Sequence, residues 1–399
     1  METGNGSPFY ILVRTGVTLE LSQLSEDVRT MAEVIANRHQ TTVDLVELAR
    51  QWLAEHAGDG APLRRAARNA QKTAIPTEEP LDAVHPLPRM PERFAVAAAD
   101  GSQIQPDRHG AVLYYLINVG SLVYHHGSGK APEAKSESIL GYTEEDLYEQ
   151  GMRVAGNLLD VRRDLAELKR LADVCENEGS SSTVALIDGS MVLWVLSDSP
   201  PGARSRKATA YLDQLDRIRC SGGIVGGFIS RPSYNEIAHL LYLASLNGDT
   251  NRAEKHPNPL ERLPDRAIFA RLPPGARSAL FVSSKKISQT DYAPRGHEVH
   301  FFYLNVVEEG QDPIIARVEV PAWVARDTGK LDLVHGAVVA QARITGDYPY
   351  ALARADELAY ISSRERAAFE EMVMTALLRA GVRSTPSPKA HYKRLTRMR

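Results

Sequence analysis

The sequence predicts an α/β protein in which helices flank a mixed sheet, with a helical extension at the N-terminus. From Phe94 onward, apolar strand-like segments alternate with segments whose apolar residues recur at helical spacing. Two of the strand-like segments, AVAAADGSQI and VALIDGSMVL, run into Asp-Gly-Ser, at Asp100 and at Asp188. Strands that alternate with helices are typical of a sheet covered by helices.

Length and composition limit the class of protein. A chain of 399 residues that is 43% hydrophobic can form one large domain or two ordinary ones. With a formal net charge of −3, any contact with DNA must come from local basic patches. Cys175 and Cys220 form no CxxC motif, which argues against a disulfide scaffold or zinc ribbon and favours a reducing cytoplasm. The N-terminus lacks a signal-peptide pattern, and without an apolar run of about 18 residues we expect no membrane span.

The chain divides into three expected segments. Residues 1–90 are interpreted as a helical arm and linker, residues 91–381 as the core domain, and residues 382–399 as a basic tail. Apolar residues at helical spacing over about 19–57 predict one or two amphipathic helices. Residues 58–91 are rich in proline, alanine and charge, so we expect a connection there.

The core elements follow in order. Strands are expected from Phe94, over 110–130 as one long strand or a hairpin, and over 135–142. Thr143 is a plausible N-cap followed by acidic residues, which predicts a long helix to about Glu178. The later expected segments are a strand at 180–198, a helix at 203–220, a glycine-rich strand at 222–230, a helix at 231–246, antiparallel strands within 279–325, and helices near 333–344, 348–362 and 364–381.

This order predicts where the acids meet. RNase H-like folds have this order: three strands, a helix, and a further strand with an acid at its end. In these folds the first and fourth strands lie side by side. Asp100 and Asp188 would then be neighbours, and Glu167, which borders an apolar helix face, could join them. Clustered carboxylates repel one another and favour a divalent cation, and two cations can hold a phosphodiester and activate water. The competing helix acids are Glu144, Glu145, Glu149, Asp160 and Asp164.

Each of these residues also has a structural interpretation. Asp-Gly after a strand is often only a turn, although two copies favour a functional role. Glu167 could equally be a solvated helix residue. In GDYPYALARADELAYIS, Pro349 suits a first helical turn, and Asp356 falls near the apolar side of that helix. A carboxylate there is costly unless it is paired or metal-bound, and the alternative is an ordinary exposed aspartate.

Several motifs together resemble one known family. They are AADGSQ, LIDGS, GGFISRPSYNEIAHLL, HFFYLNV and GDYPYALARADELAYI, spread over about residues 94–381. In order and spacing they resemble the NurA nucleases, the DNA-end-processing partners of the HerA hexameric ATPase. The resemblance implies a homodimeric, manganese-dependent nuclease, with magnesium as the alternative ion and two ions per site. Its substrates would be single- and double-stranded DNA, cut as a 5′-3′ exonuclease and a single-strand endonuclease during end resection.

The resemblance also implies roles for individual residues. Asp100 and Asp188 match the metal ligands of the first and fourth strands, and Glu167 matches the helix ligand less sharply. Tyr348 matches the tyrosine of the family's YP motif. Asp356 stands where the family often has histidine, which would either swap one ligand for another or weaken activity. A catalytically weak or inactive subunit that regulates a HerA motor is therefore the alternative function.

Basic residues and glycines complete the candidates. Arg231, Arg266 and Arg277 could each hold a DNA phosphate or serve as a structural ion-pair partner. The tail from Lys389 to Arg399 could follow the DNA backbone or be solvated. GGIVGGF resembles a nucleotide loop of the actin and sugar-kinase fold, but AADGSQ lacks the second glycine of a phosphate loop. We therefore interpret these glycines as sites of close packing.

Overall fold

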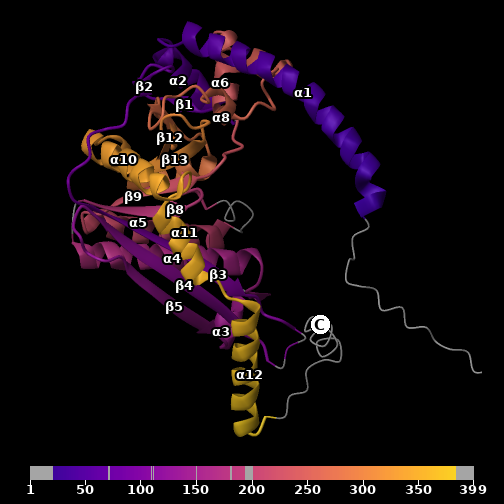
Figure 1. The fold of residues 1–399 in the computed structure, drawn as a ribbon, viewed down its shortest axis with the longest axis vertical. Coiled ribbons are helices and arrows are strands. Elements are labelled where there is room, and N and C mark those ends of the chain that lie inside the picture. The colour runs from indigo at the N-terminus through magenta and orange to yellow at the C-terminus, as the bar shows by residue number, and fades with distance from the viewer. Residues whose placement is uncertain are drawn as a thin grey trace, which may run out of the picture.

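The structure, a computed structural model, describes residues 21–70, 72–108, 110, 112–149, 151–179, 182–193 and 201–382. The core is one sheet of 11 strands with helices on both faces (Figure 1). Within the described ranges, no helix is both long and apolar enough to cross a membrane.

The half of the sheet that carries the Asp-Gly-Ser segments has a recognisable strand order. β3 (Phe94–Ile104) pairs antiparallel with β4 (Tyr115–His126), and β4 pairs antiparallel with β5 (Glu133–Gly141). β8 (Thr183–Asp188) lies parallel to β3, and β9 (Ile224–Ile229) lies parallel to β8. The spatial order is thus β5-β4-β3-β8-β9, so the first and fourth of these strands along the chain, β3 and β8, are neighbours. The expected RNase H-like mixed sheet is confirmed.

The other half of the sheet extends it beyond β9 with antiparallel strands. These are β13 (Ile315–Pro321), β12 (Val299–Asn305), β11 (Phe281–Val282), β10 (Arg277–Ser278), β1 (Ile75–Pro76) and β2 (Val84–His85). β1 pairs with β11, and β2 pairs with β10, so residues before the core domain complete its sheet.

Two apolar layers cover the two faces of the central strands. Along β3, Ala97 and Ala99 pack with α4 (Asn157–Glu178) and α5 (Pro201–Cys220). Val96 and Ala98 pack on the opposite face with α10 (Thr328–Thr345) and α11 (Tyr350–Ala359). Because successive strand residues point to opposite faces, this alternation fixes the face of each residue that follows.

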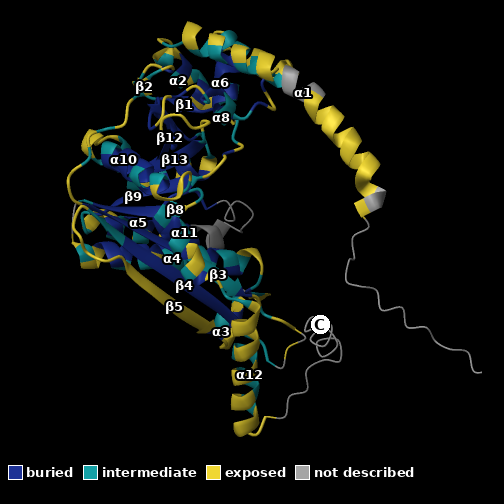
Figure 2. Ribbon diagram, viewed as in Figure 1, coloured by how far each residue is buried: buried dark blue, intermediate teal, exposed yellow. Residues whose placement is uncertain are grey.

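The remaining helices lie mostly at the two ends of the molecule. They are α1 (Leu21–Glu55), α2 (Gly60–Asn69), α3 (Glu144–Leu147), α6 (Glu236–Ser245), α7 (Thr250–Lys255), α8 (Asp265–Ile268), α9 (Ala322–Ala325) and α12 (Ser363–Arg379). A small hairpin pairs β6 (Tyr148–Glu149) with β7 (Met152–Arg153). α1 is a single helix whose N-terminal part projects away from the body and is exposed (Figure 2). Its C-terminal part packs on α6 and α8.

Two segments differ from the sequence-based expectation. Residues 58–91 are more than a connection, because Leu63 and Ala67 of α2 are buried in the cluster around α6. The long helix expected from Thr143 is interrupted. Thr143 caps only the short α3, and Gly151 and Gly156 adopt positive φ values of 76° and 53° before α4 begins. Those backbone angles belong to glycine and cannot continue a right-handed helix.

Candidate active site

Asp100 and Asp188 lie side by side where β3 and β8 reach the same edge of the sheet. The parallel register pairs Ala99 with Ile187, so the next residue of each strand is an aspartate. By alternation both aspartates belong to the face that carries Val96 and α11. The sequence-based expectation that these two acids are neighbours agrees with this register.

Glu167 reaches the same edge from α4 on the other face. It does so because Gly101 has no side chain: a Cβ atom at Gly101 would lie 2.5 Å from Oε1 of Glu167 and 2.7 Å from Cγ of Arg163. Nε of Arg163 lies 3.1 Å from the same Oε1, and its Nη2 donates to Asp164 over 3.1 Å. The glycine after Asp100 is therefore what lets the helix acid approach the strand.

α11 carries Asp356 to the other side of the site, and Tyr348 lies just before this helix. The helix is fixed at its C-terminal end, where the carbonyl of Ala359 accepts hydrogen bonds from Ser102 Oγ and from Asn118 Nδ2, the latter over 2.9 Å. Tyr348 packs edge-on against Phe228, with ring centroids 5.4 Å apart. The residue after Asp-Gly in the first segment thus anchors the helix that carries Asp356.

The acids of the site influence one another's pKa values and therefore form one electrostatic cluster. Burial raises the pKa of Asp100 to about 6, and a hydrogen bond with Asp356 and the charge of Asp188 act in the same direction. Loss of hydration raises the pKa of Asp188, while a hydrogen bond with Tyr348 opposes that shift. Burial and the nearby charges of Asp164 and Asp100 raise the pKa of Glu167 well above its usual range.

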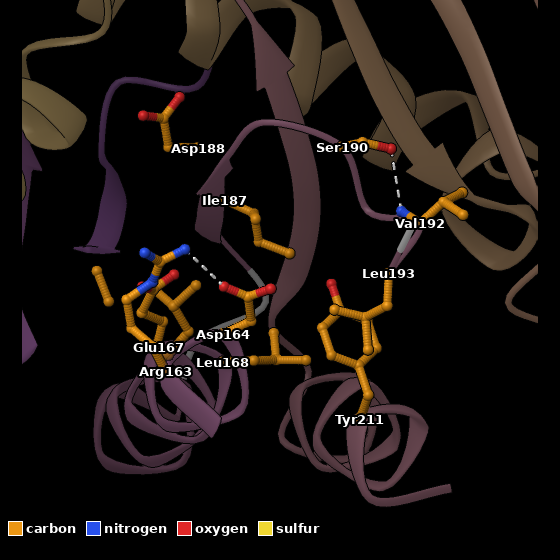
Figure 3. A pocket seen from close by; sticks show the side chains of 12 residues that line it. Arg163, Asp164, Glu167, Leu168, Ile187, Asp188, Ser190, Val192, Leu193 and Tyr211 are labelled. Atoms are coloured by element: carbon orange, nitrogen blue, oxygen red, sulfur yellow. Dashed lines mark hydrogen bonds and ion pairs between the residues drawn. The ribbon is translucent and has the colours of Figure 1, made fainter. Parts of the chain in front are cut away.

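A pocket of about 230 Å³ opens beside the acids (Figure 3). Asp188 overhangs it from one side, and Arg163, Asp164 and Glu167 project into it from α4. Tyr211 of α5 closes the far end. The pocket is therefore lined by acidic side chains together with apolar ones such as Leu168 and Ile187.

Some residues of the site were not singled out from the sequence as functional. Arg163 was missed, and Asp164 was named only as an alternative to Glu167. The one signal for both residues in the sequence is that they lie one helical turn before Glu167. Glu319 was also missed. Its Oε2 accepts hydrogen bonds from Ser190 Oγ over 2.8 Å and from the Met191 amide over 2.9 Å, which fixes the turn after Asp188.

Glu319 in turn belongs to a buried ion-pair network. Arg317 Nε lies 2.9 Å from Glu319 Oε1, and Arg317 Nη1 lies 2.7 Å from Glu236 Oε2. All three side chains are almost fully buried. An acid two residues before Pro321 on a buried strand gave no sequence signal, because its hydrogen-bond partner lies 129 residues away.

The three candidate arginines take different positions. Arg231 is exposed just beyond the end of β9, with φ of 46°, and Arg266 donates to the carbonyl of Pro232 over 2.7 Å. Arg277 is buried between β2 and β12, and its Nη2 lies 3.1 Å from Glu79 Oε1, which is the arrangement expected of a structural ion-pair partner. The basic tail from Lys389 lies outside the described residues.

The side chains of the site suit a metal ion. Asp100, Glu167, Asp188 and Asp356 offer only oxygen atoms, which suit Mg²⁺ or Mn²⁺. Oε1 of Glu167 is buried and makes no hydrogen bond, although it forms the ion pair with Arg163 Nε at 3.1 Å. A cation would also relieve the repulsion that adds to burial in raising the pKa values of these acids. The residues therefore fit a divalent cation, although no three of these acids offer oxygen atoms that all lie within 4.8 Å of one another.

Solved nuclease structures resemble this chain in fold. The NurA nuclease from Sulfolobus solfataricus aligns over 89% of this chain and 98% of its own, at 13% identity and a TM-score of 0.49. A NurA bound to dAMP and manganese aligns over 90% and 98%, at 13% identity and a TM-score of 0.39. An endonuclease V from Ciona intestinalis in complex with DNA covers 70% of this chain and 87% of its own, at 12% identity and a TM-score of 0.30.

The family itself is established by a different comparison. No curated protein matches the chain. The model of the NurA domain, however, matches residues 94–361, which begin at the first residue of β3 and end just after α11. Because this match covers well over half of the 399 residues, the chain belongs to the NurA family.

Proposed function

We propose that this chain is a metal-dependent deoxyribonuclease that hydrolyses phosphodiester bonds. The observation that carries the proposal is the convergence of Asp100, Asp188, Asp356 and Tyr348 from three separate elements, with Glu167 reaching the same edge from α4. Only hydrogen bonds and cations can compensate so many carboxylates in one small volume, and a fold gains nothing from such a cluster unless it binds something. Membership of the NurA family supports the same reaction.

The ligands that we propose for the metal are Asp100, Asp188, Glu167 and Asp356. The ion is proposed to be manganese, with magnesium as the alternative, and two ions per site are proposed. When bound, such ions polarise the phosphate and activate a water molecule. Tyr348, whose hydroxyl is bonded to Asp188, would orient the phosphate or the attacking water.

Arg231 is the proposed contact for the DNA backbone. The carboxyl ends of β8 and β9 lie at one edge, because Asp188 pairs in register with Phe228, and Arg231 follows three residues later. Arg266 holds the backbone next to Arg231 and would support it. Guanidinium groups match phosphate oxygens with two parallel hydrogen bonds.

The first experiment measures cleavage of end-labelled single- and double-stranded DNA with Mn²⁺, Mg²⁺ or EDTA. Asp100→Asn and Asp188→Asn should each abolish Mn²⁺-dependent cutting while the melting temperature stays close to that of the wild type. Glu144→Gln is the matched control, because Glu144 is an exposed acid on α3 outside the site. Wild-type protein that never cuts, alone or with a HerA-like ATPase, would overturn the proposal.

The finer activities rest on family membership. We propose a 5′-3′ exonuclease and single-strand endonuclease that resects DNA ends with a HerA-like hexameric ATPase. End-specific labels test polarity, and circular single-stranded DNA tests endonuclease activity. Uncut DNA together with an intact effect on the ATPase would instead favour a regulatory subunit, the alternative that Asp356 in place of histidine suggests. Asp356→His would then be the variant expected to restore cutting.

A homodimer is also proposed, and α1 supports it. Leu21, Leu24, Val28, Met31 and Ile35 alternate steps of three and four residues, and all are exposed. That spacing is the seam of a two-stranded coiled coil. Light scattering should give the mass of two chains for the wild type and of one chain for Met31→Glu. Equal masses would exclude this seam as the dimer contact.

A further inference from the structure

A second cluster of ligand-type side chains lies at the C-terminal end of β4, away from Gly120 in the middle of the strand, which pairs with Asp100. Among the described residues, His125, Glu133 and Glu178 form the one group whose potential ligand atoms all lie within 4.8 Å of one another. His125 is near the end of β4, Glu133 begins β5, and Glu178 is the last residue of α4. Two consecutive strands and the end of a helix therefore meet at one point.

We propose that His125, Glu133 and Glu178 bind a divalent cation of the zinc class. His125 Nε2 lies 3.5 Å from Glu133 Oε1, which is too long for a strong hydrogen bond. Two ligand atoms at zinc bond lengths of about 2.1 Å, set at a tetrahedral angle, are about 3.4 Å apart. The observed separation is thus that of two ligands of one ion.

The burial of His125 is the second observation that points to a ligand. Its side chain is only 9% exposed, and its Nε2 is buried without a hydrogen-bond partner. Such an unpaired polar atom is costly in a folded protein. Glu178 Oε2 lies 3.8 Å from Nδ1, the other ring nitrogen, and the potential ligand atoms of the two glutamates lie within 4.8 Å of each other.

The end of α4 favours positive charge at this position. A helix of 22 residues ends at Glu178, followed by Gly179 in the left-handed conformation. The C-terminus of a helix carries partial negative charge, and a carboxylate there is unfavourable unless a cation is near. Lys130 supplies one cation: its Nζ contacts Glu133 Oε1, the same oxygen atom that would bind the metal. Lys130 is half exposed on a loop with two glycines, so it can move away.

A bound ion would join the edge hairpin of β4 and β5 to α4. α4 carries Glu167, but His125 lies five residues along β4 from Gly120, the partner of Asp100 in the register. The ligand set differs as well, because the acidic site offers no imidazole. One nitrogen and two carboxylates favour Zn²⁺ or Co²⁺ over Mg²⁺.

The test uses tag-free, EDTA-treated full-length protein that carries Asp100→Asn and Asp188→Asn, so that the acidic site does not bind the probe. Titration with Co²⁺, followed by its visible absorption, and with Zn²⁺, followed by metal analysis after gel filtration, should give one bound ion per chain. Zn²⁺ should also raise the melting temperature. His125→Gln, Glu133→Gln and Glu178→Gln should each weaken binding by at least about 100-fold, more than is typical for losing an outer-shell partner.

Two further variants sharpen the result. His126→Gln is the matched control: His126 is the next residue, stacks on Phe94 with ring centroids 4.2 Å apart, and should bind metal as the parent does. Lys130→Gln should bind more tightly, because it removes the competing ammonium group. Absence of binding in the parent, or equal binding by His125→Gln and Glu133→Gln proteins that melt normally without metal, would overturn the proposal. None of these measurements depends on DNA cleavage.

Discussion

The substitution Gly101→Ala should displace Glu167 in the site and leave the stability of the fold nearly unchanged. Gly101 lies within β3 and its φ is not positive, so the backbone accepts alanine without strain. The new Cβ would lie 2.5 Å from Oε1 of Glu167, whereas ordinary contacts begin at 3.4 Å. The carboxylate oxygen must therefore retreat by about 0.9 Å, and the Arg163 side chain must move with it.

The magnitudes of the two effects differ. The atoms displaced belong to long side chains at the rim of a pocket, so we expect the free energy of unfolding to fall by about 1 kcal/mol at most, the low end for overpacking. A displacement of about 1 Å in a catalytic group can lower a rate by about 100-fold. We therefore expect Mn²⁺-dependent cleavage of labelled DNA to fall by roughly that factor, with nearly unchanged thermal unfolding.

Gly120→Ala is the matched comparison. A Cβ atom at Gly120 would overlap the backbone of Ala355 and Ala359, so the whole of α11 must shift. This variant should lose about 1–3 kcal/mol of stability. In a double-mutant cycle, Gly101→Ala should add little to Glu167→Gln, because both act on one carboxylate. Wild-type cleavage by Gly101→Ala, or full additivity with Glu167→Gln, would refute the claim that Glu167 acts in the site.

Three further predictions concern the hydrogen bonds and buried groups. Tyr348→Phe removes the hydrogen bond that holds the pKa of Asp188 down, so the acid limb of the pH–rate profile should move to higher pH and the rate should fall about tenfold. Asp265→Ala leaves the amides of Ile237 and Ala238 and the hydroxyl of Tyr303 without an acceptor, and urea unfolding should show a loss of about 3 kcal/mol that Asp265→Asn partly avoids. Burial lowers the pKa of His335 to about 4, below its unfolded value of about 6.5, so stability should be full above pH 6.5 and fall by up to about 3 kcal/mol toward pH 4. His335→Gln should flatten that loss, and an unchanged pH profile in urea unfolding would contradict it.

The neighbouring aspartates could be predicted because their signal is local. Each follows an apolar run, and strand order alone makes the first and fourth strands neighbours. The choice of helix acid could not be settled in the same way. Glu144 was a candidate ligand because we expected one helix to run from Thr143 to Glu178. That helix is broken by glycines with positive φ, and a sequence does not reveal the φ value of a glycine.

Ion pairing was the other limit of sequence reasoning. Arg277 and Arg231 look alike as isolated arginines, but the acid that pairs with Arg277 lies 198 residues away in the sequence. Its burial depends on β2, a two-residue strand in a segment that reads as a linker. Ion-pair partners that only the tertiary fold brings together produce no periodic pattern in the sequence, so sequence analysis cannot identify them.

The two Asp-Gly-Ser segments are alike in sequence but differ in what surrounds them. In the first, Gly101 continues the strand and makes room for Glu167, while Ser102 holds the end of α11. In the second, Gly189 turns the chain at φ of 94° and donates to the carbonyl of Phe228.

Ser190 then bonds to Glu319 rather than to a helix. The parallel register brings the two aspartates together, and each glycine-serine pair attaches a different part of the protein to them. Alanine at Gly101 should therefore impair chemistry, whereas alanine at Gly189 should impair folding, because an L-residue is strained at that φ.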